Sequence, residues 1–227
     1  MFKKKLVTLS SMLLAATLLT ACSGADVIGK TAVTSFDKFL GAMEQQVSFD
    51  EAKNSWVIKT PTGEFFEYSK DFSNTISDAA VEFDAAPFIE AGLDTTKLPE
   101  VDYVYDPSTG RIRMPHALSE DEFKYTGDAT AIDTFKKIVD TNRDVIGYHE
   151  ELDHYGIALG GGNMFEWAKD MSKNDKDMVI VLNPQPFIDA GVDPSAVEGW
   201  VFGKVKVKDD SGKMVEVDKL LKPFDIQ

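Results

Sequence analysis

Apolar residues follow a helical spacing in two separate stretches of the chain. They recur three and four positions apart over residues 33–47 and again over residues 132–146. This spacing gives each stretch a single apolar stripe, as on a helix that packs against a core. Thr34–Ser35 and Asp133–Thr134 stand where N-cap residues of such helices are expected. The pattern therefore predicts two amphipathic helices.

After each helix the pattern changes to the period of two that is typical of β-strands. Trp56, Ile58 and Thr60 alternate with their neighbours, and the turn sequences TPTG and GGGN predict a hairpin in each half. The segment after GGGN, NMFEWAKDMS, fits a helix or a strand. Its counterpart EFFEYSKDFS has aromatic residues at every second position, which favours a strand in both halves.

A third strand and a short helix follow in each half. The runs AAVEFD and MVIVLN predict short buried strands, after which Pro87 or Pro186 begins a short helix that Gly92 or Gly191 ends. Each half ends in a strand–turn–strand segment, with DPSTG as the turn in the first half and DDSG in the second. The elements predict an α+β fold built from α-β-β-β-α-β-β units with mostly antiparallel sheets.

The two halves are related in sequence. FEYSKD at residues 66–71 returns as FEWAKD at residues 165–170, and a shift of 99 positions aligns residues 33–98 without a gap, with 17 identities over 66 positions. A period of this length is that of a domain rather than of a solenoid repeat. We therefore expect two tandem copies of one unit, residues 32–125 and 126–227.

The amino terminus has the features of an export signal. Lys3–Lys5 precede an apolar run that ends in Leu19, Thr20, Ala21 and Cys22, and the run is short for a transmembrane helix. This ending resembles the lipobox of bacterial lipoproteins. The resemblance implies a signal peptide over residues 1–21, a diacylated Cys22 as the new amino terminus, and an extracytoplasmic location on the membrane.

An ordinary secretory signal with a chance cysteine is the alternative. Under the lipoprotein interpretation, residues 22–31 form a short tether that keeps the body close to the bilayer, and two acyl chains supply the anchor.

The net charge and the cysteine content exclude several classes of function. The formal net charge is −14, and without Lys3–Lys5 the 21 remaining basic and 38 acidic residues give 21 − 38 = −17. Such an acidic chain is unsuited to nucleic acid, which binds Lys and Arg through phosphate. Cys22 is the only cysteine, so the mature body has no disulfide and no thiolate nucleophile.

Polar residues that the two halves share are the first candidate site. One interpretation is structural, with ion pairs, turns and caps. The other is a ligand-binding surface on which Tyr68 or Trp167 stacks on a sugar ring or a peptide beside charged groups. The shared charged residues are Glu67 and Glu166, Lys70 and Lys169, and Asp71 and Asp170.

The segment HEELDH, which runs from His149 to His154, is the second candidate. Two histidines with carboxylates nearby are ligands for Zn²⁺, but a separation of five differs from the i, i+4 pair of helical zinc motifs. The first half has Asp50 and Ser55 at the matching positions. We therefore expect a solvated surface loop, with a metal site as the alternative.

No recognisable catalytic constellation appears in the sequence. The function that it favours is a non-enzymatic, lipid-anchored envelope protein that binds a sugar or peptide ligand or acts as a scaffold, and no cofactor is expected. The alternative is an envelope hydrolase or metal-dependent enzyme that uses carboxylates or His149 and His154.

Overall fold

The structure, a computed structural model, describes residues 22–71, 78–118, 125, 127–141, 145–149, 152–171, 177–208 and 213–224. The expected signal peptide lies outside these residues. In chain order the elements are α1 (Cys22–Ala42), β1 (Val47–Asp50), β2 (Ser55–Lys59), β3 (Phe65–Ser69), β4 (Ala79–Asp84), α2 (Ala86–Glu90), η1 (Thr95–Lys97), β5 (Val104–Asp106), β6 (Arg111–His116), α3 (Ala131–Thr141), β7 (Ile146–His149), β8 (His154–Ala158), β9 (Met164–Ala168), β10 (Met178–Leu182), α4 (Gln185–Asp189), η3 (Pro194–Ala196), β11 (Val201–Lys208) and β12 (Met214–Phe224).

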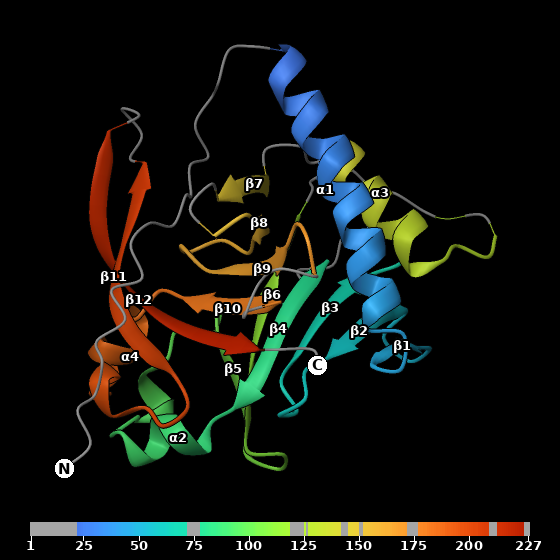
Figure 1. Ribbon diagram of the computed structural model, residues 1–227. Helices are drawn as coiled ribbons and strands as arrows, with labels where there is room; N and C mark the ends of the chain where they lie inside the picture. Colours follow the sequence, from blue (N-terminus) through green and yellow to red (C-terminus); the bar gives the residue numbers. More distant parts are fainter. Residues whose placement is uncertain are drawn as a thin grey trace.

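The strands form two six-stranded antiparallel sheets. The first has the order β1-β2-β3-β4-β6-β5, and the second, read from its other edge, has the order β7-β8-β9-β10-β12-β11. In both, a meander of four strands is followed by a hairpin whose second strand pairs with the fourth strand of the meander. The expected α+β class with mostly antiparallel sheets is confirmed (Figure 1).

Each half contains one strand more than the sequence predicts. Helix α1 ends at Ala42 and α3 at Thr141, whereas the expected helices continue to residues 47 and 146. Val47 and Ile146 instead open β1 and β7, where they pair with Ile58 and Ile157. Val47 lies four residues after the buried Met43, so its spacing fits a helix although its backbone pairs in the sheet.

The starts of the two helices also differ from the prediction. Residues 22–31, expected as a tether, belong to α1, and Ser35 lies inside this helix rather than at its cap. At α3 the cap is Thr130: its hydroxyl accepts from the backbone N–H of Asp133, whose carboxylate accepts from the Thr130 N–H in return. Asp133 thus takes part in capping, in a capping-box arrangement.

Several local predictions are confirmed. The segment after GGGN is the strand β9, and α2 and α4 both carry proline in their first turn. Gly92 and Gly191 adopt φ angles of 106° and 103°, in the region that favours glycine. The turn DPSTG joins β5 to β6, while the DDSG turn lies outside the described residues.

One hydrophobic core joins the two halves. Phe66 of β3 stacks on Phe165 of β9 with ring centroids 4.3 Å apart, and Phe36 of α1 stacks on Phe135 of α3 at 3.7 Å. The sheets therefore bury their facing sides against each other, with α1 and α3 packed together on one side and α2 and α4 at the opposite end (Figure 1). Each of these aromatic pairs joins residues that are 99 positions apart.

Equivalent segments of the two halves also contact each other where α2 and α4 end. The backbone N–H of Asp94 donates to the Ala190 carbonyl, and the N–H of Asp193 donates to the Ala91 carbonyl, each at 2.9 Å. A Cβ atom on Gly92 would lie 2.7 Å from the carbonyl oxygen of Gly191. Glycine is needed here for its close backbone contact as well as for its φ angle.

Candidate functional site

The two aromatic residues expected to offer a binding platform lie in the core. Tyr68 and Trp167 are both 0 % exposed, on the face of their strands that also carries Phe66 and Phe165. The Tyr68 hydroxyl donates to the Ala131 carbonyl, and burial raises the pKa of this phenol well above its ordinary value. Neither ring presents a face on which a ligand can stack.

The shared lysines occupy equivalent positions outside the core. Lys70 lies over the ring of Phe49, with its Nζ 5.6 Å from the ring centroid, and Lys169 lies over Tyr148 at 5.1 Å. Lys169 is also 3.6 Å from Asp153. These contacts are weak cation–π interactions and a surface ion pair, and they hold the ends of the strands in place.

The shared aspartates stand just after the same strands. Asp71 accepts from the side-chain amide of Asn54 and from the backbone N–H of Tyr125, so it ties the β1–β2 turn to the segment before α3. Asp170 occupies the corresponding position after β9. In Asp71 the polar side chain holds a loop in place.

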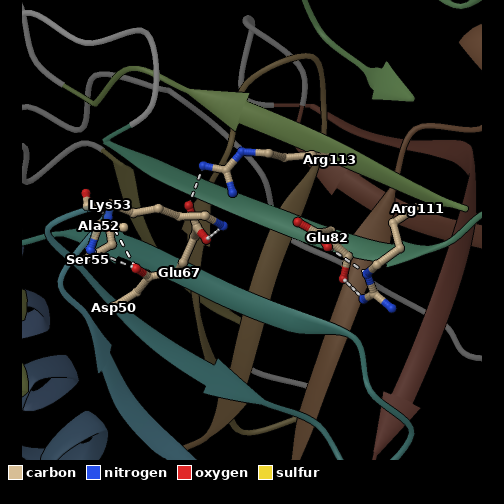
Figure 2. Close-up of polar contacts among 8 residues, drawn as sticks. All are labelled: Asp50, Ala52, Lys53, Ser55, Glu67, Glu82, Arg111 and Arg113. Atoms are coloured by element: carbon tan, nitrogen blue, oxygen red, sulfur yellow. Dashed lines mark hydrogen bonds and ion pairs between the residues drawn. The ribbon is translucent and has the colours of Figure 1, made fainter. Parts of the chain in front are cut away.

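Glu67 lies on the opposite face of β3 from the core and is 2 % exposed. Its carboxylate is 3.1 Å from the Lys53 ammonium and also forms an ion pair with the Arg113 guanidinium, so two cations compensate one buried anion. Figure 2 shows both cations reaching Glu67, and beside them Arg111 paired with Glu82 at 2.6 Å. The outer face of the first sheet thus carries a row of ion pairs, here called the charged ladder, formed by Lys53, Glu67, Arg113, Glu82 and Arg111.

Glu166 holds the position of Glu67 in the second sheet but has different partners. It is 1 % exposed, and its Oε2 lies 3.5 Å from His154 Nδ1 and 4.0 Å from His149 Nδ1. The expectation of a solvated loop for these histidines is wrong, because they lie in β7 and β8 and are 5 % and 2 % exposed. Glu150 and Glu151 between them lie outside the described residues.

Strand register explains why the three side chains meet. His149 and His154 face each other across β7 and β8, and Gly156 of β8 faces Glu166 of β9. Because side chains alternate along a strand, all three polar groups project from the same face. A Cβ on Gly156 would lie 3.1 Å from Glu166 Cγ, so the glycine leaves space for the glutamate.

The surroundings of the two glutamates differ in kind. Leu152 stands 99 residues after Lys53, and Leu221 pairs with β10 where Arg113 pairs with β4. Both leucines belong to a small apolar cluster on this face of the second sheet. The second sheet thus keeps the buried anion, replaces its two permanent cations by apolar side chains, and adds two imidazoles.

The electrostatic balance at Glu166 follows from these neighbours. Burial acts to raise the pKa of its carboxyl group, but His149 and His154 act in the other direction and leave the pKa lowered. Oε1 and Oε2 of Glu166, Nδ1 of His154 and both ring nitrogens of His149 are buried and have no hydrogen-bond partner. Buried groups of this kind are uncommon in folded proteins.

Within the described residues, no three His, Cys, Asp or Glu side chains are arranged to hold a metal ion. His149 and His154 therefore belong to no such group within the described part of the chain. The site is an ion-pair cluster in which one acid faces two bases.

Glu166 and the two histidines are separate candidates in the sequence, because they lie in different segments of the chain. The GGGN turn is the sequence feature that could have connected them. A hairpin closed at Gly160–Asn163 sets Gly156 opposite Glu166, and this register places His154 beside Glu166. The role of Gly156 and of the leucines depends on packing and has no local signal.

No protein-family model, curated protein or solved structure matches this chain. Of the helices that the structure describes, none has both the length and the apolar character needed to cross a membrane.

Proposed function

We propose that this chain is a bacterial lipoprotein held on the outer side of the cell membrane by acyl chains on Cys22. The proposal is carried by one observation, the sequence Leu19-Thr20-Ala21-Cys22 at the end of an apolar run that follows Lys3–Lys5. The acidic body supports it, because a net charge of −17 would be repelled by anionic lipid and needs a separate anchor.

The shape of α1 fits an anchor at its first residue. Cys22 is the first residue of α1, whose amino-terminal turns extend beyond the sheets in Figure 1. A helix of 21 residues is about 30 Å long. Acylation at its tip joins the body to the membrane through a rigid helix instead of a loose tether.

We further infer that the body arose by duplication of one α+β unit. The equal strand orders of the two sheets support this inference, as do the pairs of equivalent residues that contact each other, Phe36 with Phe135 and Phe66 with Phe165. Such self-equivalent contacts arise where two copies meet about a two-fold axis. The ancestral unit then functioned as a dimer.

The role that we propose for this body is binding or scaffolding without catalysis, with an envelope sugar or peptide as its partner. Ligand contact is expected on accessible polar groups rather than on Tyr68 or Trp167. The charged ladder of the first sheet offers such groups, since the Lys53 side chain is 42 % exposed and the Arg113 side chain 23 %.

The anchor is tested in intact cells with Cys22→Ser and with Ser23→Ala as the matched control. We expect the wild type and Ser23→Ala to incorporate a palmitate analogue and to sediment with membranes. Cys22→Ser should incorporate none and should leave the membrane fraction, because the thiol is the acceptor. A Cys22→Ser protein that still sediments with membranes would contradict the proposal.

A further inference from the structure

The cluster of Glu166, His149 and His154 has a feature that its counterpart in the first sheet lacks. Glu67 is paired with Lys53 and Arg113, an ammonium and a guanidinium group. Glu166 is as deeply buried, and its ionic partners among the described residues are two imidazoles, which are cationic only when protonated. The charge of this second cluster therefore depends on how many protons it holds.

We propose that Glu166, His149 and His154 form a proton-binding site that couples the packing of the β7–β8 hairpin on β9 to the surrounding pH. One proton from solvent adds to a ring nitrogen of the pair and makes the cluster neutral. When that proton returns to solvent, the part of the chain that the structure describes supplies no other cation within ion-pair distance of the remaining anion. An uncompensated buried charge is strongly destabilising.

The geometry supports proton binding at this place. The Oε2 atom of Glu166 is 3.5 Å from His154 Nδ1 and 4.0 Å from His149 Nδ1, and the three side chains are at most 5 % exposed. Several of their polar atoms have no hydrogen-bond partner. A proton on either imidazole gives the carboxylate the cationic neighbour that it otherwise lacks.

The other described side chains on the Glu166 face of the second sheet do not supply a positive charge beside Glu166. Strand β10 presents Val179 and Val181 beside Glu166, and β12 presents Leu221. Further along, the face carries Lys219, whose Nζ donates to the Gly162 carbonyl near the far end of β9, and Asp177, an acid that precedes β10.

Asp153 precedes His154 but is engaged elsewhere, with the Tyr148 hydroxyl and Lys169. Helices α1 and α3 pack on the core side of the sheet. Among the described residues, the imidazoles are therefore the nearest groups that can neutralise Glu166.

The direction of the pH effect follows from these groups. The pKa of Glu166 is lowered, so its contribution to stability is present above the ordinary value for glutamate and is lost as the pH falls through the lowered pKa. Above that range the carboxylate is charged, and its compensation depends on a proton held by one of the neighbouring imidazoles. The cluster therefore stabilises the second sheet as long as it holds that proton.

The experiment compares Glu166→Gln with the matched control Glu67→Gln in the full chain, purified in mild detergent. The unfolding equilibrium constant is measured by urea titration at about pH 6 and about pH 9, on either side of the imidazole range. We expect the ratio of mutant to wild-type constants to change at least about tenfold between the two pH values for Glu166→Gln. For Glu67→Gln it should change less than about threefold, because the partners of Glu67 are a lysine and an arginine rather than imidazoles.

A ratio for Glu166→Gln that is independent of pH would overturn the proposal. If that variant does not fold, nitrogen-15 ring spectra of the wild type decide the question, with His116 of β6 as an internal comparison. We expect a cluster imidazole to be protonated at the lower pH and neutral at the higher one. Rings that stay neutral at both, or stoichiometric Zn²⁺ that His149→Ala removes, would also overturn it.

Discussion

At the scale of single residues, equivalent positions in the two halves have kept their geometry while their chemistry has changed. Glu67 and Glu166 occupy the same place on the third strand of their sheets, yet one is neutralised by Lys53 and Arg113 and the other faces imidazoles. Both positions carry a buried carboxylate, but its partners differ. The proposed response to pH therefore depends on the environment of the carboxylate rather than on its place in the sheet.

Gly191 gives a prediction at this scale. Its φ angle is 103°, and a Cβ there would lie 2.9 Å from the Gly92 carbonyl oxygen, whereas Gly63 has a φ of 95° with open space around it. Gly191→Ala therefore combines backbone strain with a clash, and Gly63→Ala has the strain alone. We expect losses of about 3 kcal/mol and about 1 kcal/mol in the free energy of unfolding.

Urea denaturation of the two variants measures this difference directly. Equal losses would mean that the contact between Gly92 and Gly191 adds nothing to the conformational cost.

At the scale of elements, strand periodicity was a better guide than helix boundaries. The alternation of Phe66 and Tyr68 correctly predicted a strand with both rings on one face, because side chains alternate along a strand. The first strand of each half was missed, since Val47 and Ile146 satisfy the helical spacing as well. A short strand at the edge of a sheet has too few residues to establish a period of its own.

The β2–β3 turn gives the element-scale prediction. Glu64 is 3.1 Å from Lys222 of β12 and accepts from the hydroxyls of Thr60 and Thr62, so it links the two sheets. Burial acts to raise the pKa of Glu64, but these hydroxyls and the lysine outweigh it and leave the pKa lowered. Its contribution is present above the ordinary pKa of glutamate and is lost as the pH falls through the lowered value.

We therefore expect Glu64→Gln to reduce the free energy of unfolding by about 2 kcal/mol at neutral pH, the range for hydrogen bonds to charged groups. The difference from wild type should shrink below about pH 4. Glu90→Gln, on the exposed end of α2, is the control and should have little effect at any pH. Denaturation curves across this pH range test the prediction, and a constant difference would refute it.

At the scale of the whole molecule, the two halves are not independent domains side by side. A single core contains Phe66 stacked on Phe165 and Phe88 against Phe187, and the backbone hydrogen bonds of Asp94 and Asp193 cross between the halves. Each half exposes one whole face of its sheet when the other is removed. The sequence repeat thus corresponds to two halves that share one core.

Separately produced fragments test this view. We expect residues 22–125 or 126–227 alone to show no cooperative unfolding transition, because each would leave its half of the core in water. Mixed together, the fragments should assemble one to one, as judged by gel filtration and circular dichroism. A Phe66→Ala fragment should assemble poorly, and a cooperative transition from either fragment alone would contradict the prediction.

The amino-acid sequence by itself determined the class of fold, the order of most elements and the internal repeat, and it placed the aromatic residues of the repeated strand on one face. These properties depend on periodicity and turn chemistry, which act over a few residues. The tertiary structure decided that His149 and His154 are buried, that they share Glu166, and that Trp167 is closed to ligands. Such properties depend on strand register and on what packs across the sheets, and no local stretch of sequence specifies them.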